Sequence, residues 1–271
     1  MNDRFLIGSI TKSVFATAVL QPVAAGRLRL SDTVAHLDPA LARKYPIASQ
    51  KTVRQLLGMT SRIPDYADPA VARMFANSQQ GFTRDQAITL GIAEGKPIPA
   101  PGGYSTTNYL LLGKLMAKIT GSTPEQLVNS VFTRSGMTSS RLMQGNVQMP
   151  EPKAHGYLGA VYGPQAAQVN PSLSGTTDVT DWAMEWGKEG GGAYATIADL
   201  ATWGQTCLGI LRQGDWLTHS GQALGYTANV ACNPKTGAVI AYALNSTEGP
   251  LDLSSGFGLT AWPDYVKAEA S

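Results

Sequence analysis

The sequence predicts a mixed α/β (α+β) fold, in which an antiparallel sheet is flanked by helices and joined to a mostly helical lobe. Apolar residues at helical spacing dominate the first half of the chain, whereas β-branched and aromatic runs come near its end. Helices followed by strands, without regular alternation, are typical of this class. The 271 residues, 43 % of them hydrophobic, suffice for a large core, so we expect a single domain over 1–271. Its helical lobe should cover about 35–140 and its sheet mainly 210–250.

The first half of the chain should contain five helices. Val14, Ala18 and Val19 have helical spacing in a run from Ser9 to Ala25, which Gly26 should end. The other predicted helices cover residues 52–59, 83–92, 108–121 and 122–132. Ser122 and Glu125 have the spacing of a capping box at the start of the last one.

The second half should be poor in helix until residue 196. Gly, Pro and Trp are frequent between Met143 and Gly192, which predicts loops with short strands. A helix over 196–208 follows, with Thr196 and Asp199 as a capping pair. Three strand-like runs come next, and the turn at 233–237 should join the last two into an antiparallel hairpin. These runs are 216–221, 226–233 and 238–246.

Composition argues against several classes of function. The net charge is +2 and Lys and Arg form no basic run, so no nucleic-acid surface is indicated. No apolar stretch reaches the roughly 18 residues of a membrane span, and the first residues lack the pattern of a signal peptide. Three widely spaced histidines and the lack of a metal-binding motif argue against a metal site, and nothing in the sequence indicates another cofactor.

The chain has two cysteines, Cys207 and Cys232. Two cysteines allow one disulfide but do not imply it. We favour two half-buried free thiols.

The segment "GSITKSV" at 8–14 places Ser9 and Lys12 three residues apart at the start of a helix. A serine is a weak nucleophile unless a base or a positive field activates it. A lysine three residues later lies on the same helix face, and burial would lower the pKa of its ammonium group. The spacing alone is common, and without more context Ser9 would be a helix N-cap and Lys12 a solvated cation.

The surrounding residues resemble the serine penicillin-recognising enzymes, which include D-alanyl-D-alanine carboxypeptidases, class C β-lactamases and β-lactamase-fold esterases. The matching positions are Phe5, Gly8, Ser9, Lys12, Gly26, Leu28, Leu30 and Asp32, and the segment 52–66 also resembles the family. The resemblance implies a β-lactamase/DD-peptidase-like fold with Ser9 as nucleophile and Lys12 as its activating base.

The family's second element is a Y-x-N segment, which "PGGYSTTNYLLLG" at 101–113 resembles. Tyr104 takes the tyrosine position, and beside an ammonium group it should act as a phenolate base together with Lys12. Thr106 takes the asparagine position as a substrate-binding residue. It offers one hydroxyl instead of an amide, so recognition of a peptide or β-lactam side chain should differ. Asn108 has the wrong offset and should instead start the helix.

The third element is a K-T-G or H-T-G triplet, and "THSGQALGY" at 218–226 supplies His219, Ser220 and Gly221. We predict a catalytic role for His219 in the proton relay, or in holding a substrate carboxylate when protonated. Ser220, Gly221 and Gln222 should bind substrate, and Gly221 should let the substrate lie close to the strand. By resemblance, the backbone N–H groups of Ser9 and Gln222 form the oxyanion hole.

Other residues are expected to have structural roles. Glu189, in a glycine-rich turn that packs near the site, should be a solvated or capping carboxylate, and the alternative is a group that supports the site residues from behind. The three tryptophans Trp182, Trp186 and Trp216 are expected in the core rather than in a pocket.

Two parts of the usual family fold are expected to be missing. No strands precede the Ser9 segment, which would leave the sheet with an exposed edge and make a homodimer through that edge plausible. The chain is also short near 208–215, where a break is expected if segments have been omitted.

Together these features predict a serine hydrolase that forms an acyl-enzyme with a small-molecule or peptide substrate. A D-Ala-D-Ala-type carboxypeptidase ranks first, close to a carboxylesterase of the same fold, with a β-lactamase third. A non-catalytic relative that binds acyl-peptides is the alternative of another class. A peptidase would be periplasmic or secreted and an esterase cytoplasmic, and the sequence leaves this open.

Overall fold

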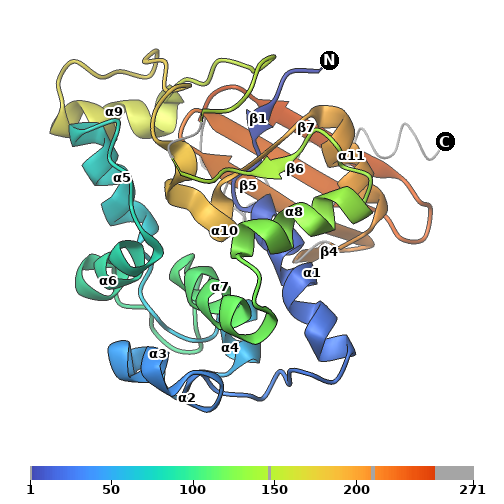
Figure 1. The fold of residues 1–271 in the computed structure, drawn as a ribbon. Coiled ribbons are helices and arrows are strands. Elements are labelled where there is room, and N and C mark those ends of the chain that lie inside the picture. Colours follow the sequence, from blue (N-terminus) through green and yellow to red (C-terminus); the bar gives the residue numbers. More distant parts are fainter. Residues whose placement is uncertain (1, 146–147, 209–210, 248–271) are drawn as a thin grey trace.

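The computed structural model describes residues 2–145, 148–208 and 211–247. A four-stranded antiparallel sheet occupies one side of the molecule and a group of helices the other (Figure 1). The long helix α1 (Ile10–Ala24) contacts the sheet at one end and helices of the lobe along its length. The predicted mixed class with an antiparallel sheet is confirmed.

The six predicted helices are present in the predicted order among the described residues. Five α-helices that were not predicted accompany them, namely Val34–Leu37, Pro39–Lys44, Ala67–Ala76, Gly159–Val169 and Lys188–Gly191. The lobe begins with short helices, and longer ones follow. Their bounds are α2 (Val34–Leu37), α3 (Pro39–Lys44), the 3₁₀ turn η1 (Pro46–Ala48), α4 (Val53–Leu57), α5 (Ala67–Ala76), α6 (Arg84–Glu94), α7 (Thr107–Thr120) and α8 (Pro124–Arg134). The later helices are α9 (Gly159–Val169), the 3₁₀ turn η2 (Met184–Gly187), α10 (Lys188–Gly191) and α11 (Ile197–Gln205).

The main sheet has the order β4-β5-β6-β7. Its strands are β4 (Leu211–Gln213), β5 (Trp216–Ala223), β6 (Tyr226–Cys232) and β7 (Val239–Leu244). The predicted hairpin is confirmed, with Cys232 opposite Val239 across the turn. A second, small sheet has the order β1-β3-β2 and consists of β1 (Phe5–Leu6), β2 (Arg141–Leu142) and β3 (Ala193–Ala195).

Helix α1 is buried on more than one face because elements surround it. Ile10, Val14, Phe15 and Val19 are all fully buried. Helices α7, α8 and α10 and strands β5 and β6 contact it. A helix that is apolar nearly all round is typical of a central position in a core. The first turn of α1, which carries the predicted nucleophile, is therefore held by the sheet and by the lobe at once.

Three predictions of local structure are corrected. The capping box of α8 uses Thr123 and Gln126, one residue later than predicted, because Pro124 occupies the first helical position. Helix α9 lies in the stretch 143–192 that was expected to hold only loops and strands. Thr196 does cap α11, but the Asp199 carboxylate accepts hydrogen bonds from Ser139 and Ser140 instead of closing a capping box.

Within the described residues, no strand pairs with the outer edge of β7. In the described residues 2–9, the one strand before α1 is β1, which belongs to the small sheet. An exposed edge and a homodimer through it remain predictions. The expected break near 208–215 falls partly on residues 209–210, which lie outside the described residues.

The prediction of free thiols is wrong. Cys207, directly after α11, forms a disulfide with Cys232 at the end of β6. Helix α11 packs on β6 and β7, so the bond fixes the end of this helix to the sheet it covers. Sequence spacing could not indicate the pairing because it depends on this packing.

We expect the substitution Cys207→Ser to lower the free energy of unfolding by roughly 3 kcal/mol, because the bond closes a loop with a sequence separation of 25. Urea denaturation of wild type and variant measures the difference. Repeating both with a thiol reductant is the control, since the two proteins should then have nearly equal midpoints. A difference that survives reduction would mean that the serine disturbs packing instead.

Candidate active site

A cleft of about 230 Å³ lies where α1, α10 and β5 meet at the junction of sheet and lobe (Figure 1). Six of the eight predicted site residues line it, namely Ser9, Lys12, Tyr104, Thr106, Ser220 and Gln222. They come from the start of α1, the segment before α7 and strand β5. Segments up to 213 residues apart in sequence thus meet in one cleft, as the three-element pattern predicts.

The turn before Ser9 packs directly against the backbone of β5. Gly8 has φ +49°, and a Cβ there would lie 2.5 Å from the backbone nitrogen of Gln222. A Cβ on Gly221 would collide with the carbonyl oxygen of Ile7 and lie 3.0 Å from the backbone nitrogen of Ser9. Both positions therefore require glycine. The close approach brings the backbone nitrogens of Ser9 and Gln222 to the same end of the cleft.

Lys12 is buried beside the serine. Its Nζ donates to Ser9 Oγ at 3.0 Å and to the Gly190 carbonyl oxygen at 2.5 Å, and the residue is only 1 % exposed. Burial lowers the pKa of Lys12 to about 7, although the charge of Asp65 opposes this shift. A sizeable fraction of Lys12 is therefore neutral near pH 7. A solvated lysine is excluded, and Ser9 does not cap α1 with its side chain.

Tyr104 reaches the serine from the opposite side. Its hydroxyl donates to Ser9 Oγ at 2.6 Å, and Lys12 Nζ lies 4.7 Å from the centre of its ring. Desolvation of the hydroxyl raises the pKa of Tyr104 well above its usual value, and the hydrogen bond with Ser9 only partly opposes this. This direction of the pKa shift opposes the expected phenolate. In this arrangement the Tyr104 hydroxyl is a hydrogen-bond donor to Ser9.

Thr106 is buried, and its hydroxyl donates to Asp65 Oδ2 at 3.4 Å. Asp65, just before α5, lines the same cleft and was not singled out from the sequence. Burial raises the pKa of the Asp65 carboxyl, while the charge of Lys12 opposes the rise. The carboxylate lies within the segment 52–66 that resembles the family, and this was the only signal for it. Asn108 instead accepts a hydrogen bond from Ser61 in the core.

Strand β5 separates its predicted site residues by face. Ser220 and Gln222 line the cleft, whereas His219 does not. His219 is 4 % exposed, and its Nδ1 lies 2.6 Å from the Ser220 carbonyl oxygen, which assigns the proton to Nδ1. Burial lowers the pKa of His219 to about 4. The imidazole is therefore neutral at pH 7, and the expectation that it holds a substrate carboxylate as a cation is not met.

Glu189 is fully buried, which corrects its prediction as a solvated or capping carboxylate. The Arg84 guanidinium donates to both of its oxygens, at 3.0 and 3.1 Å from Nε, and also pairs with Glu125 at 2.5 Å. Burial raises the pKa of the Glu189 carboxyl, and the Arg84 charge opposes the rise. The ion pairs join α6, α8 and α10. They hold the backbone of α10, whose Gly190 carbonyl anchors Lys12.

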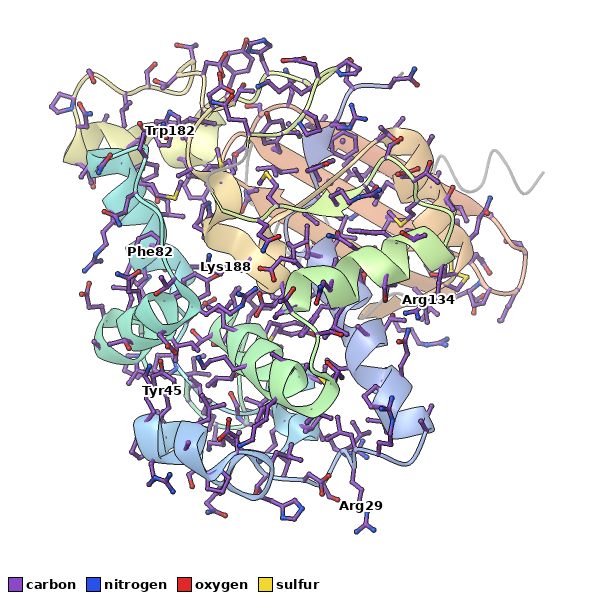
Figure 2. The ribbon with its side chains drawn as sticks, viewed as in Figure 1. Arg29, Tyr45, Phe82, Arg134, Trp182 and Lys188 are labelled. Carbon is purple, nitrogen blue, oxygen red and sulfur yellow. A yellow bond between two sulfur atoms is a disulfide. The ribbon has the colours of Figure 1, made fainter. Side chains whose placement is uncertain are left out.

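Phe82 and Lys188 are labelled in Figure 2. Phe82 precedes α6 and Lys188 begins α10, the two helices that Arg84 and Glu189 connect. Both residues are buried. Trp182, also labelled there, packs against the core as predicted. Trp186 is likewise part of the core but lines the cleft with one face. Trp186 was expected in the core rather than in a pocket, and it belongs to both.

None of the helices among residues 2–145, 148–208 and 211–247 is long and apolar enough to cross a membrane. The same residues contain no group of three His, Cys, Asp or Glu side chains that could hold a metal ion.

A family model described as Beta-lactamase matches residues 1–215. PbpX of Bacillus subtilis (strain 168), which is named as a penicillin-binding protein, is 30 % identical over 155 residues. That match covers 56 % of this chain and 36 % of the relative. Penicillin-binding protein 4 of Amycolatopsis lactamdurans is matched over 35 % of its length, so the chain spans about a third of these curated relatives.

Solved structures of similar fold include the D-amino acid amidase of Ochrobactrum anthropi SV3 in complex with L-phenylalanine. Its TM-score is 0.79 at 22 % identity, with 100 % of this chain and 86 % of that chain covered. A D-stereospecific amidohydrolase from a Streptomyces species has a TM-score of 0.74 at 23 % identity, with 90 % and 82 % covered. These likenesses establish a shared fold.

The substitution Glu189→Gln should lower the free energy of unfolding by about 3 kcal/mol, because it removes a buried charge that Arg84 faces. Chemical denaturation measures this. Glu94→Gln is the matched control, since Glu94 also pairs with an arginine, Arg73, but on the surface. Its effect should be barely detectable. Equal losses in the two variants would contradict the importance of burial.

Proposed function

This chain belongs to the Beta-lactamase family, and from that membership we propose that it is a serine hydrolase which cleaves a carboxylic amide or ester through an acyl-enzyme. The observation that carries the proposal is the pair of contacts on Ser9 Oγ, from Lys12 Nζ at 3.0 Å and from the Tyr104 hydroxyl at 2.6 Å. A serine between a lysine with lowered pKa and a tyrosine donor has the arrangement of an activated nucleophile.

In the first step neutral Lys12 accepts the Ser9 proton while Oγ attacks the substrate carbonyl carbon. The carbonyl oxygen becomes an oxyanion, which the backbone N–H groups of Ser9 and Gln222 would stabilise. The close approach at Gly8 and Gly221 supports this role, because it fixes both nitrogens without intervening side chains.

In the second step the bond to the leaving group breaks and the leaving atom takes a proton. Tyr104 is the donor, because its high pKa keeps the hydroxyl protonated, and it recovers the proton from Lys12. A water then attacks the acyl-enzyme with the same groups in reversed roles. This returns Ser9 and releases the acid.

The substrate class follows from the charges in the cleft. A D-Ala-D-Ala-type carboxypeptidase must hold a terminal carboxylate, and Lys12 is the only cation among the described residues that line the cleft. Lys12 is already engaged with Ser9 and Gly190, and His219 is neutral. We therefore rank amides and esters without a free carboxylate first. The carboxypeptidase is the second candidate, supported by the names of the curated relatives.

A β-lactamase remains third, since Thr106 offers no amide to a β-lactam side chain. The non-catalytic alternative predicts that Ser9 is never acylated.

We expect wild type, but not Ser9→Ala, to hydrolyse p-nitrophenyl butyrate, because only the hydroxyl can form the acyl-enzyme. Intact mass after incubation with this ester, and separately with a fluorescent penicillin, detects the covalent step. Fast ester turnover without a penicillin adduct favours an amidase or esterase. A stable penicillin adduct on wild type alone favours the carboxypeptidase. Absence of any Ser9-dependent signal would support the binding-only alternative.

For the same ester, kcat/KM should rise with pH through about 7, because Lys12 must lose its proton to act as base. Below this pH the rate should fall about tenfold per unit, and Lys12→Met should lose the activity.

A second readout is independent of catalysis. Between about 7 and 10.5 the unfolded lysine holds a proton that the folded one has lost, so wild-type stability should rise with pH there. Lys12→Met should lack this rise. A midpoint of the rate near 10, or identical pH dependence of stability in both proteins, would contradict the role of Lys12.

A further inference from the structure

We infer that Asp65 and Thr106 form a subsite for a positively charged amino group on the acyl part of the substrate. The preferred substrates would then be amides or esters of amino acids whose amino group is free. This inference rests on the proposed function, because it assigns a substrate class to the same cleft.

The Asp65 carboxylate has room for a further hydrogen-bond donor. Asp65 lines the cleft, and its oxygens accept hydrogen bonds from the Ala67 amide at 3.2 Å, the Thr106 hydroxyl at 3.4 Å and the Thr106 backbone N–H. Among the described residues, no Lys or Arg lies within ion-pair distance of Asp65. A carboxylate has about four acceptor sites, so capacity remains for a further donor. A partly buried anion without a cation in contact is one that a ligand ammonium would stabilise.

Thr106 changes what the cleft wall offers to a substrate. An asparagine at this position would present both a donor and an acceptor to a neutral amide. Thr106 instead directs its hydroxyl toward Asp65, so the polar group that this wall offers to substrate is an anionic oxygen. Thr106 in the asparagine position and the Asp65 carboxylate thus act together as one polar surface of the cleft.

Other residues of the cleft fit a small polar ligand. Gln222 Nε2 is buried without a hydrogen-bond acceptor among the described residues, and Gln222 lines the cleft. Val71, Tyr162 and Trp186 supply an apolar wall that could accept a side chain. At about 230 Å³ the cleft is below the range of roughly 300–1,000 Å³ typical for drug-sized ligands. An amino acid derivative matches this size.

Asp68 also lines the cleft but is highly exposed and pairs with Lys96, so it should contribute little to selectivity. Asp65 has one competing role. Its charge raises the proton affinity of Lys12, and a variant could lose activity for that reason alone. The test must separate the two roles.

The test compares two substrates that differ in one group. These are alanine p-nitroanilide, as both D and L forms, and isobutyric p-nitroanilide, in which a methyl group replaces the ammonium. The ratio of their kcat/KM values cancels any effect on Lys12, because both substrates use the same base. For wild type, we expect the kcat/KM of one alanine enantiomer to exceed that of isobutyric p-nitroanilide at least tenfold. Asp65→Asn should reduce that ratio about 10- to 100-fold, mainly through KM.

Asp215→Asn, an exposed aspartate paired with Lys235, removes the same charge elsewhere and should leave the ratio unchanged. Equal losses for both substrates in Asp65→Asn, or no preference in wild type, would overturn the inference while the proposed function stands.

A binding experiment tests the subsite even if the proposed hydrolase activity is not found. Calorimetry of Ser9→Ala with alaninamide and with isobutyramide measures recognition without turnover. We expect alaninamide to bind at least tenfold more tightly, and the double variant with Asp65→Asn to lose this difference. Equal affinities would overturn the inference whatever the outcome for catalysis.

Discussion

The contact between buried Lys12 and Ser9 is the constraint on which the site depends. An ammonium group resists burial, and in this fold it is surrounded by α1, α10 and the tyrosine before α7. The same burial that lowers the pKa of Lys12 to about 7 opposes folding while the group is charged. The rest of the core offsets this. Burial of Lys12 would thus both activate Ser9, in the proposed mechanism, and lower the stability of the folded protein.

The groups of the site are supplied by two different parts of the fold. Tyr104, Thr106 and Asp65 come from the lobe, whereas Ser220 and Gln222 come from the sheet edge. The Arg84 cluster connects α10 to the lobe helices α6 and α8. Since the Gly190 carbonyl accepts a hydrogen bond from Lys12, an ion-pair cluster that does not line the cleft still determines where Lys12 lies. In the proposed mechanism, the groups for proton transfer and for oxyanion stabilisation therefore come from different parts of the fold that meet at the start of α1.

Features of this site that lie within one segment could be predicted from the sequence. The serine–lysine spacing at the start of α1 and the final hairpin both depend on local geometry. Asp65 and Glu189 could not be assigned, because their roles come from partners 41 and 105 residues away. The Cys207–Cys232 bond and the neutral state of His219 depend equally on packing. Tyr104 was correctly placed, but the sign of its pKa shift depends on desolvation that a sequence does not report.

The close contact between the Ile7–Ser9 turn and β5 also limits which substitutions this protein can accept. Gly8 and Gly221 meet backbone atoms, and backbone cannot be exchanged by mutation to make room. A single substitution of Gly8 or Gly221 should therefore be selected against as long as Ser9 serves as the nucleophile. Thr106 and Asp65 face each other through side chains and can change together. Lineages of this fold should therefore acquire new substrates by altering the lobe wall, while the sheet wall stays the same.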